Sequence, residues 1–209
     1  MESLGPGGVA AAGGLSQEEE DELGPQAFLH GTHSLKWIHW INKGLTEGYE
    51  KDVGSKMTHW FLYPESAMDL NNSTHLVLFP FKILDMQWFI SAFTTKNITQ
   101  TYVQVPSTIK ANKVKVMILH PEFIRYVYDN WAEGHGRYPS TGFLTLMFAL
   151  HICDEVNIFG FGATSDGNWH HYFDKTLTYE IGVHGGKLES ETINRLEQEN
   201  KILIHKGWT

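Results

Sequence analysis

Short apolar runs recur along the chain from residue 76 onward. Runs of this kind favour buried β-strands. In the first of them, Pro80 predicts either an early end to the strand or a position at the sheet edge, because proline has no N–H to donate. The strands are expected at residues 76–82, 114–119, 155–161 and 201–205.

Helical patterns separate these runs. Asp85 is predicted to be the N-cap of a first amphipathic helix. Pro121 fits the first turn of a second helix, which runs to about Glu133. A third helix, 142–153, is apolar on nearly every face and therefore belongs in the core. The last helix is expected at 190–199.

The order of these elements predicts an α/β fold in which helices flank a mostly parallel sheet on both faces. We find no repeat and no second domain, so 28–209 is expected to be one domain and the Gly/Ala-rich, then acidic segment 1–27 to be disordered. Residues 28–45 have no clear period, and whether they supply a strand in the sheet centre stays open. Ligands of such sheets bind beyond the carboxyl ends of the strands, which directs attention to 160–162 and to the loop before Ser140.

Charge and composition narrow the classes of partner and compartment. A formal net charge of −8 argues against a nucleic-acid partner. The sequence contains no run of about 20 apolar residues, so we expect no membrane-spanning helix. The N-terminal residues lack the pattern of a secretory signal. Cys153 is the single cysteine, which excludes an intramolecular disulfide and suits a reducing compartment or a chance free thiol. Against a reducing compartment stand N-x-Ser/Thr sequons, whose candidate glycan acceptors are Asn71, Asn72 and Asn97.

Residues 135–142 carry the first candidate site. Ser140, Thr141 and Gly142 open the buried helix, and the N–H groups of a helix N-terminus bind phosphate well. The alternative is an ordinary serine N-cap without a ligand, which is the commoner case. The glycine-rich turn at 160–162 matches neither a dinucleotide motif nor an ATP motif.

Histidines and tyrosines supply the other candidates. His170, His171 and His184 suit general acid–base catalysis, because histidine titrates near neutral pH, with a structural role as the alternative. Adjacent histidines on an extended segment point in opposite directions and no cysteine accompanies them, so a zinc site is disfavoured. The tyrosines near turns, which suit sugar recognition or ordinary packing, are Tyr63, Tyr102, Tyr138 and Tyr172.

Segments spread over 41–209 together resemble the animal sialyltransferases, in the motif order of that family. In chain order they resemble the second half of the large sialylmotif (41–66), the small sialylmotif (120–162), the third motif (167–174) and the very small motif, His-x4-Glu (184–189). The combination of HGRYPSTG and GNWHHY is similar to the β-galactoside α-2,3-sialyltransferases that act on Galβ1-3GalNAc ends.

The resemblance implies a GT-A-like sialyltransferase fold and an inverting transfer of sialic acid from CMP-sialic acid to the 3-hydroxyl of a terminal galactose, without a metal or another cofactor. His184 matches the general base, and His171 matches the histidine that assists the departing phosphate. The residues that match donor-site positions are Asn42, Ser140, Thr141, Gly142 and Gly162. The residues that match acceptor-side and donor-rim positions are Tyr63, Tyr102, Tyr138 and Trp169. The family also implies the Golgi, galactose-terminated glycoprotein or glycolipid acceptors, and homo-oligomers or hetero-oligomers with other glycosyltransferases.

The chain departs from the family at its N-terminal end. Residues 1–40 look unrelated to the family, and the first half of the large sialylmotif has no counterpart. Whether the sheet lacks the first strand of the family is therefore an open question. We also expect no counterpart here to the family's cytosolic tail, membrane anchor and stem. Cys153 matches a cysteine that bridges the large and small motifs in the family, but its partner is missing. Three functions are therefore weighed: an active sialyltransferase, an inactive truncated isoform that acts as a binding or interaction protein, and, with least support, a generic α/β nucleotide-binding protein.

Overall fold

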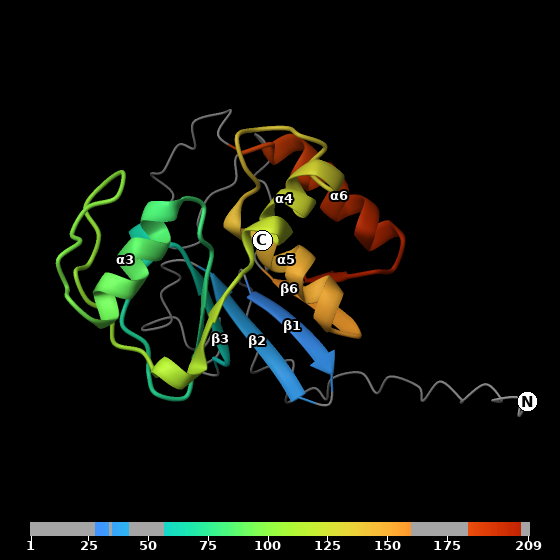
Figure 1. Cartoon of the computed structure of the whole chain (residues 1–209). Coiled ribbons are helices and arrows are strands. Elements are labelled where there is room, and N and C mark those ends of the chain that lie inside the picture. Colours follow the sequence, from blue (N-terminus) through green and yellow to red (C-terminus); the bar gives the residue numbers. More distant parts are fainter. Residues whose placement is uncertain (1–27, 34, 42–56, 160–183, 206–209) are drawn as a thin grey trace, which may run out of the picture.

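The computed structural model describes residues 28–33, 35–41, 57–159 and 184–205 (Figure 1). The expected disorder of 1–27 lies outside these residues. So do several of the predicted site residues, namely Asn42, Gly162, Trp169 and His171.

The described strands form one seven-stranded sheet in the order β5-β4-β3-β2-β1-β6-β7. In chain order they are β1 (Phe28–His33), β2 (Leu35–Ile41), β3 (His59–Leu62), β4 (His75–Leu78), β5 (Val116–Ile118), β6 (Glu155–Phe159) and β7 (Leu203–His205). β1 is antiparallel to both of its neighbours, β2 and β6. Every other pair is parallel. The prediction of a mostly parallel sheet is therefore confirmed.

The centre of the sheet comes from the segment for which the pattern predicted no element. β1 and β2 pair with each other, and β1 lies between β2 and β6. Residues 28–41 therefore do supply central strands. Their sequence mixes histidine, lysine and threonine with apolar residues, but the ladder bonds of a sheet come from the backbone, so such a segment can pair when strands lie on both sides.

β3 and β4 are parallel neighbours in the sheet, and the sequence predicted only the second of them. β3, which was not predicted, is buried at all four positions. β4 ends before Pro80, which confirms the predicted early end of the strand. The alternative, a position at the sheet edge, is wrong because β4 lies between β3 and β5. Phe79 N still donates to Leu62 O at 2.9 Å, so the pairing with β3 stops only at the proline.

Within the described residues, the helices follow the expected order but differ at their ends. They are α3 (Ile83–Phe93), α4 (Pro121–Asn130), α5 (Thr141–Ile152) and α6 (Gly186–Gln198), with 3-10 turns η1 (Pro64–Ser66) and η2 (Lys113–Lys115). α6 begins at Gly186 rather than at Ser190, and α4 ends at Asn130 rather than near Glu133. Glu133 has a φ of +48°, which a right-handed helix cannot contain.

The prediction that Asp85 is the N-cap of α3 is wrong. Lys82 is the N-cap, and Asp85 lies at the third helical position. Its Oδ2 accepts hydrogen bonds from the backbone N of Phe81 at 2.9 Å and of Lys82 at 3.0 Å. An acidic residue at the third position reaches back to the residues before the helix, and aspartate favours both positions, so sequence pattern alone does not separate them.

Each face of the sheet has its own core. Phe61 and Val77 pack with α4, α5 and α6 on one face, whereas Trp60 and Leu76 pack with α3 on the other. Figure 1 shows α3 on one side of the sheet and the other three helices opposite. The two faces alternate along β3 and β4, as the period of a strand requires. Among the described residues, none of the helices combines the length and the apolar composition that crossing a membrane requires.

Candidate active site

The N-terminus of α5 is built around Ser140. The Ser140 Oγ accepts a hydrogen bond from the backbone N of Phe143 at 3.1 Å, which is the N-cap geometry that the sequence predicts. The backbone N of Ser140 donates in turn to Oε1 of Glu189, at 2.8 Å. Thr141, nearly buried, and Gly142 follow in the first turn of the helix. The start of α5 is therefore fixed from within by its cap and from α6 by a carboxylate.

His184 lies directly against the loop that leads into α5. It forms an isolated antiparallel bridge with Gly136, and its Nδ1 lies 3.0 Å from the carbonyl O of Tyr138. A carbonyl oxygen only accepts, so Nδ1 carries the proton and donates it. In the neutral ring, Nε2 then holds a lone pair. The Tyr138 ring packs edge-on against the imidazole, with centroids 5.0 Å apart, and this contact limits how far the ring can turn.

Gly136 is required for this close approach. Its φ is +75°, and a Cβ at this position would lie 2.6 Å from Gly185 N and 2.8 Å from His184 C. Both clashes are with backbone, which cannot move aside without moving His184. The Tyr128 Oη lies within hydrogen-bond distance of the carbonyls of Gly134 (2.8 Å) and Gly136 (3.1 Å) and holds the same loop from α4.

Glu189 connects His184 to α5. It lies in the first turn of α6, where its N–H donates to Gly185 O at 2.9 Å, so the His-x4-Glu spacing places histidine just before the helix and glutamate just inside it. The Glu189 side chain is buried. Burial raises the pKa of its carboxyl. Hydrogen bonds from Ser140 oppose that rise, as does the charge of His184 when its ring is protonated.

A row of rings runs from His184 to the carboxyl ends of β3 and β4. The Tyr138 ring centroid lies 5.1 Å from that of Phe81, and the Phe81 centroid lies 6.2 Å from that of Tyr63. Tyr63 directly follows β3, and Phe81 follows β4. Sequence reasoning missed Phe81, although its position just beyond a parallel strand was a signal that could have found it.

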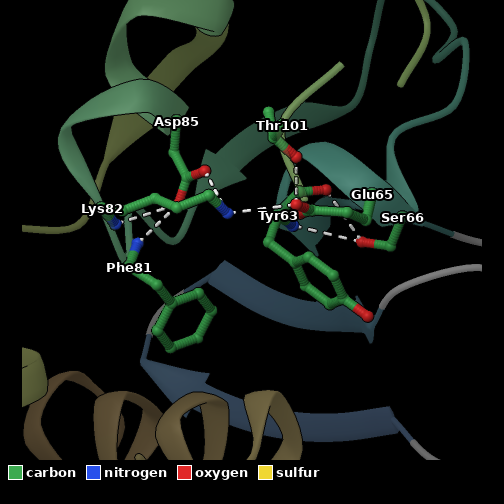
Figure 2. Close-up of polar contacts among 7 residues, drawn as sticks. All are labelled: Tyr63, Glu65, Ser66, Phe81, Lys82, Asp85 and Thr101. Atoms are coloured by element: carbon green, nitrogen blue, oxygen red, sulfur yellow. Dashed lines mark hydrogen bonds and ion pairs between the residues drawn. The ribbon is translucent and has the colours of Figure 1, made fainter. Parts of the chain in front are cut away.

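Tyr102 stands beside a second polar cluster, drawn in Figure 2. The Lys82 Nζ lies 2.8 Å from Asp85 Oδ1 and 3.1 Å from Glu65 Oε1, and it also lies 3.8 Å from the centroid of the Tyr102 ring. The Thr101 hydroxyl donates to Glu65 Oε1. Sequence reasoning did not single out Lys82, Glu65 or Thr101.

The pKa shifts in this cluster follow from its contacts. Burial acts to lower the pKa of Lys82, but hydrogen bonds and charge from Asp85 and Glu65 outweigh it and raise that pKa. For Glu65, burial is outweighed by the bonds from Thr101 and Lys82, which lower the pKa of its carboxyl. Burial raises the pKa of Asp85 against the opposing effect of Lys82. Asp85 also accepts two backbone N–H bonds, so we assign it as a carboxylate paired with the ammonium.

Other predicted residues lie apart from these contacts. Asn71, Asn72 and Asn97 are exposed, so glycan attachment there stays a prediction. Burial raises the pKa of the Cys153 thiol to about 11, with a further contribution from Asp154. Within the described ranges, no group of three or more His, Cys, Asp or Glu side chains is arranged to hold a metal ion.

Comparison with known proteins finds a family match that includes nearly all of the region in which the motifs lie. The family model for Glycosyltransferase family 29 (sialyltransferase) matches residues 33–201. The prediction that residues 1–40 are unrelated to the family is therefore wrong for 33–40. The chain is 48% identical over 202 residues to the CMP-N-acetylneuraminate-beta-galactosamide-alpha-2,3-sialyltransferase 1 of Sus scrofa, covering 95% of this chain and 57% of that protein. It is 48% identical over 178 residues to the corresponding sialyltransferase 2 of Mus musculus, covering 83% of this chain and 51% of that protein.

A crystal structure of a mammalian sialyltransferase in complex with Gal-beta-1-3GalNAc-ortho-nitrophenol is similar to this fold. The TM-score is 0.76 at 52% sequence identity, covering 84% of this chain and 62% of that one. The chain thus spans a little over half the length of the curated relatives that it matches.

Proposed function

This chain belongs to glycosyltransferase family 29, the sialyltransferases, and on that premise we propose that it transfers sialic acid from CMP-sialic acid to the 3-hydroxyl of a terminal galactose of the Galβ1-3GalNAc type. The resemblance predicted from the motif order is confirmed by the family match and by the named relatives. The acceptor class is supported by the disaccharide in the similar crystal structure.

One observation carries the proposal, namely the setting of His184. Its Nδ1 donates to Tyr138 O, so Nε2 holds the lone pair that a general base needs. We propose that Nε2 removes the proton of the acceptor hydroxyl as its oxygen bonds to the anomeric carbon of sialic acid. The bond from that carbon to the phosphate oxygen breaks on the opposite side, CMP leaves with the electron pair, and the anomeric configuration inverts.

The donor is proposed to bind at the start of α5. The N–H groups of Thr141 and Gly142 and the Thr141 hydroxyl are proposed to bind the phosphate at the positive end of the helix, and Ser140 is proposed to line the site while its own N–H donates to Glu189. That Ser140 caps the helix does not exclude this, because its Oγ is used in the cap while the following N–H groups begin the turn. Asn42 and Gly162 are proposed to complete the donor site.

The acceptor side is proposed to be lined by aromatic residues. Tyr138 and Tyr63 belong to the row of rings that leads away from His184, and such rings present an apolar face and a polar edge to a sugar. Tyr102 and Trp169 complete this set in the proposal. His171 is proposed to be cationic and to stabilise the charge that develops on the leaving phosphate.

Further parts of the proposal follow from family membership. We propose that residues 28–209 act as one catalytic domain, that neither a metal nor another cofactor is needed, and that the protein works in the Golgi on glycoprotein or glycolipid acceptors. Association with itself or with other glycosyltransferases is proposed on the same ground. Asn71, Asn72 and Asn97 are proposed glycan acceptors.

A transfer assay tests the proposal. The purified protein is incubated with CMP-sialic acid and a Galβ1-3GalNAc acceptor, and the product is checked for an α-2,3 linkage. We expect a sialylated product that a linkage-specific α-2,3 sialidase removes. A folded protein that forms no product under these conditions would contradict the proposal.

A second candidate is an inactive protein that binds partner glycosyltransferases or glycans. It is suggested by Cys153, which is a free cysteine here, although the resemblance matches it to a cysteine that bridges two motifs in the family. Calorimetric titration with CMP separates the two, because an active enzyme must bind the nucleotide part of its donor. No measurable CMP binding by the folded protein supports the second candidate.

A further inference from the structure

Tyr102 lies at the tip of a short hairpin between α3 and β5. The backbone N of Val105 donates to Thr99 O and that of Thr101 to Val103 O, both at 2.9 Å, and Gln100 pairs with Gln104. The Tyr102 side chain is 76% exposed. A ring this exposed gains little from burial, so its position depends on the few contacts that it makes.

Two contacts attach the tip of this hairpin to the ends of β3 and β4. The Tyr102 ring lies 3.8 Å below the Lys82 ammonium, within the range of a cation–π interaction. Its neighbour Thr101 donates to Glu65. Lys82 and Glu65 are themselves paired at 3.1 Å, so consecutive residues of the hairpin bind the two halves of one ion pair, as Figure 2 shows for Thr101.

The ammonium is fixed more firmly than a surface lysine would be. Lys82 is the N-cap residue of α3, and its Nζ lies 2.8 Å from the carboxylate of Asp85, whose side chain is fully buried. Asp85 is held by the backbone N–H groups of Phe81 and Lys82. The same carboxylate therefore orients the Phe81 segment of the ring row and the cation under which Tyr102 sits.

An alternative role for Lys82, direct binding of an anionic donor group, is disfavoured by charge. One ammonium faces two carboxylates, Glu65 and Asp85, so the cluster has a net charge of −1 when all three groups are ionised. A cluster with that charge repels a phosphate or a carboxylate. The interaction that Lys82 can offer the site is therefore the contact of its ammonium with the face of the Tyr102 ring.

We propose that Lys82 is a positioning residue that holds Tyr102 over the acceptor side of the site. This inference rests on the proposed function, in which Tyr102 contacts the acceptor. Lys82 acts on acceptor binding through the ring, and Asp85 and Glu65 act by fixing the ammonium. The donor site at the start of α5 is held by Ser140 and Glu189, which share none of these contacts.

A double-mutant cycle tests this inference. Because Lys82→Met alone leaves the buried Asp85 carboxylate without its cation, the cycle is run with Asp85→Asn present throughout, after circular dichroism has shown a folded protein. In that background we expect Tyr102→Leu to raise the KM for the acceptor about tenfold and Lys82→Met about fivefold, with kcat and the donor KM within about twofold. The variant that combines both changes should raise the acceptor KM no more than about tenfold. Once the Tyr102 ring is gone, the loss of the Lys82 cation has no further effect on acceptor binding.

One conservative variant and one matched control sharpen the cycle. Lys82→Arg keeps the cation, so it should stay within about twofold of the background. Lys113 is the control, because its Nζ lies 5.7 Å from the Phe93 ring centroid on the far part of α3, and Lys113→Met should leave the acceptor KM unchanged. Effects of Lys82→Met and Tyr102→Leu that multiply to about fiftyfold, or an equal rise in the donor KM, would overturn the inference.

A second measurement does not depend on activity. Chymotrypsin cleaves after exposed tyrosine. In the same Asp85→Asn background, a hairpin released from Lys82 should be cut after Tyr102 several-fold faster in Lys82→Met than in Lys82→Arg. Equal cleavage rates would overturn the positioning role. If Tyr102→Leu leaves the acceptor KM unchanged while Lys82→Met does speed this cleavage, then the acceptor role of Tyr102 in the proposed function is wrong and the positioning of the ring by Lys82 is upheld.

Discussion

The two sides of the candidate site are held together by different physics. Around His184, the contacts are a backbone bridge to Gly136, a bond to a backbone carbonyl, and a buried carboxylate on the N–H of Ser140. Around Tyr102, they are an ion pair, a hydroxyl on a carboxylate and a cation over an exposed ring. The first side is fixed by main chain and the second by side chains.

This difference fits the tasks proposed for the two sides. A general base must be held within a fraction of an ångström of its proton donor, and backbone contacts provide that precision. An acceptor wall has to admit and release a sugar, and side-chain contacts that water can reach allow such movement. Breaking the His184 side should therefore cost stability, whereas breaking the Tyr102 side should change binding.

The largest expected effect comes from Gly136→Ala. The added Cβ would lie 2.6 Å from Gly185 N at a φ of +75°, so the bridge to His184 has to open. We expect the free energy of unfolding to fall by about 3 kcal/mol, of which about 1 kcal/mol is backbone strain and the rest is overlap. Urea unfolding followed by tryptophan fluorescence measures it.

Gly134→Ala is the matched control for this change. Gly134 has a similar φ of +71°, but a Cβ there would meet nothing within 4 Å. Only the strain should remain, at about 1 kcal/mol. Equal losses in the two variants would show that the close approach of His184 to the loop does not contribute to stability.

A smaller effect is expected in the pH dependence of stability, because Glu189 on one side and Glu65 on the other should change the free energy of unfolding in opposite directions. Burial raises the pKa of Glu189 above its usual 4.5, so the folded state holds this proton more tightly, and the stability that results is full at low pH and lost as pH rises through the raised pKa. Hydrogen bonds from Thr101 and Lys82 lower the pKa of Glu65, against the effect of burial. Its contribution is full above 4.5 and lost as pH falls through the lowered pKa.

The measurement is the free energy of unfolding between about pH 3 and pH 7. The difference between wild type and Glu189→Gln should shrink as pH rises, and the difference between wild type and Glu65→Gln should grow. Glu191→Gln, at an exposed residue paired with Lys187 at 3.8 Å, is the control for the removal of one surface carboxylate. Slopes of the same sign for Glu65 and Glu189 would contradict the contrast between the two sides.

Local pattern predicted some of the fold well. α5 was found because it is apolar on nearly every face and is preceded by Ser140, and both signals lie within one short segment. β1 and β2 were missed because their polar residues hide a strand that exists only between neighbours. Asp85 was placed one turn wrongly because aspartate favours both the cap and the third position.

The site divides in the same way. The motifs singled out Ser140, Tyr138 and His184 as candidates, and the structure brings these three residues together. That Glu189 holds Ser140, 49 positions away, depends on how α6 packs beside α5. The pairing of Lys82 with Glu65 spans 17 positions and two strand ends. No local pattern carries such contacts, because the sheet topology creates them.

Measuring the transfer rate and the CMP affinity together in His184→Ala tests whether His184 is the general base. We expect kcat to fall by more than about 100-fold, as for the loss of a general base, while the Kd for CMP stays within about twofold because the start of α5 is held by Ser140 and Glu189. A variant that loses rate and CMP affinity to the same extent would contradict this role, since His184 would then be a structural support of the donor site.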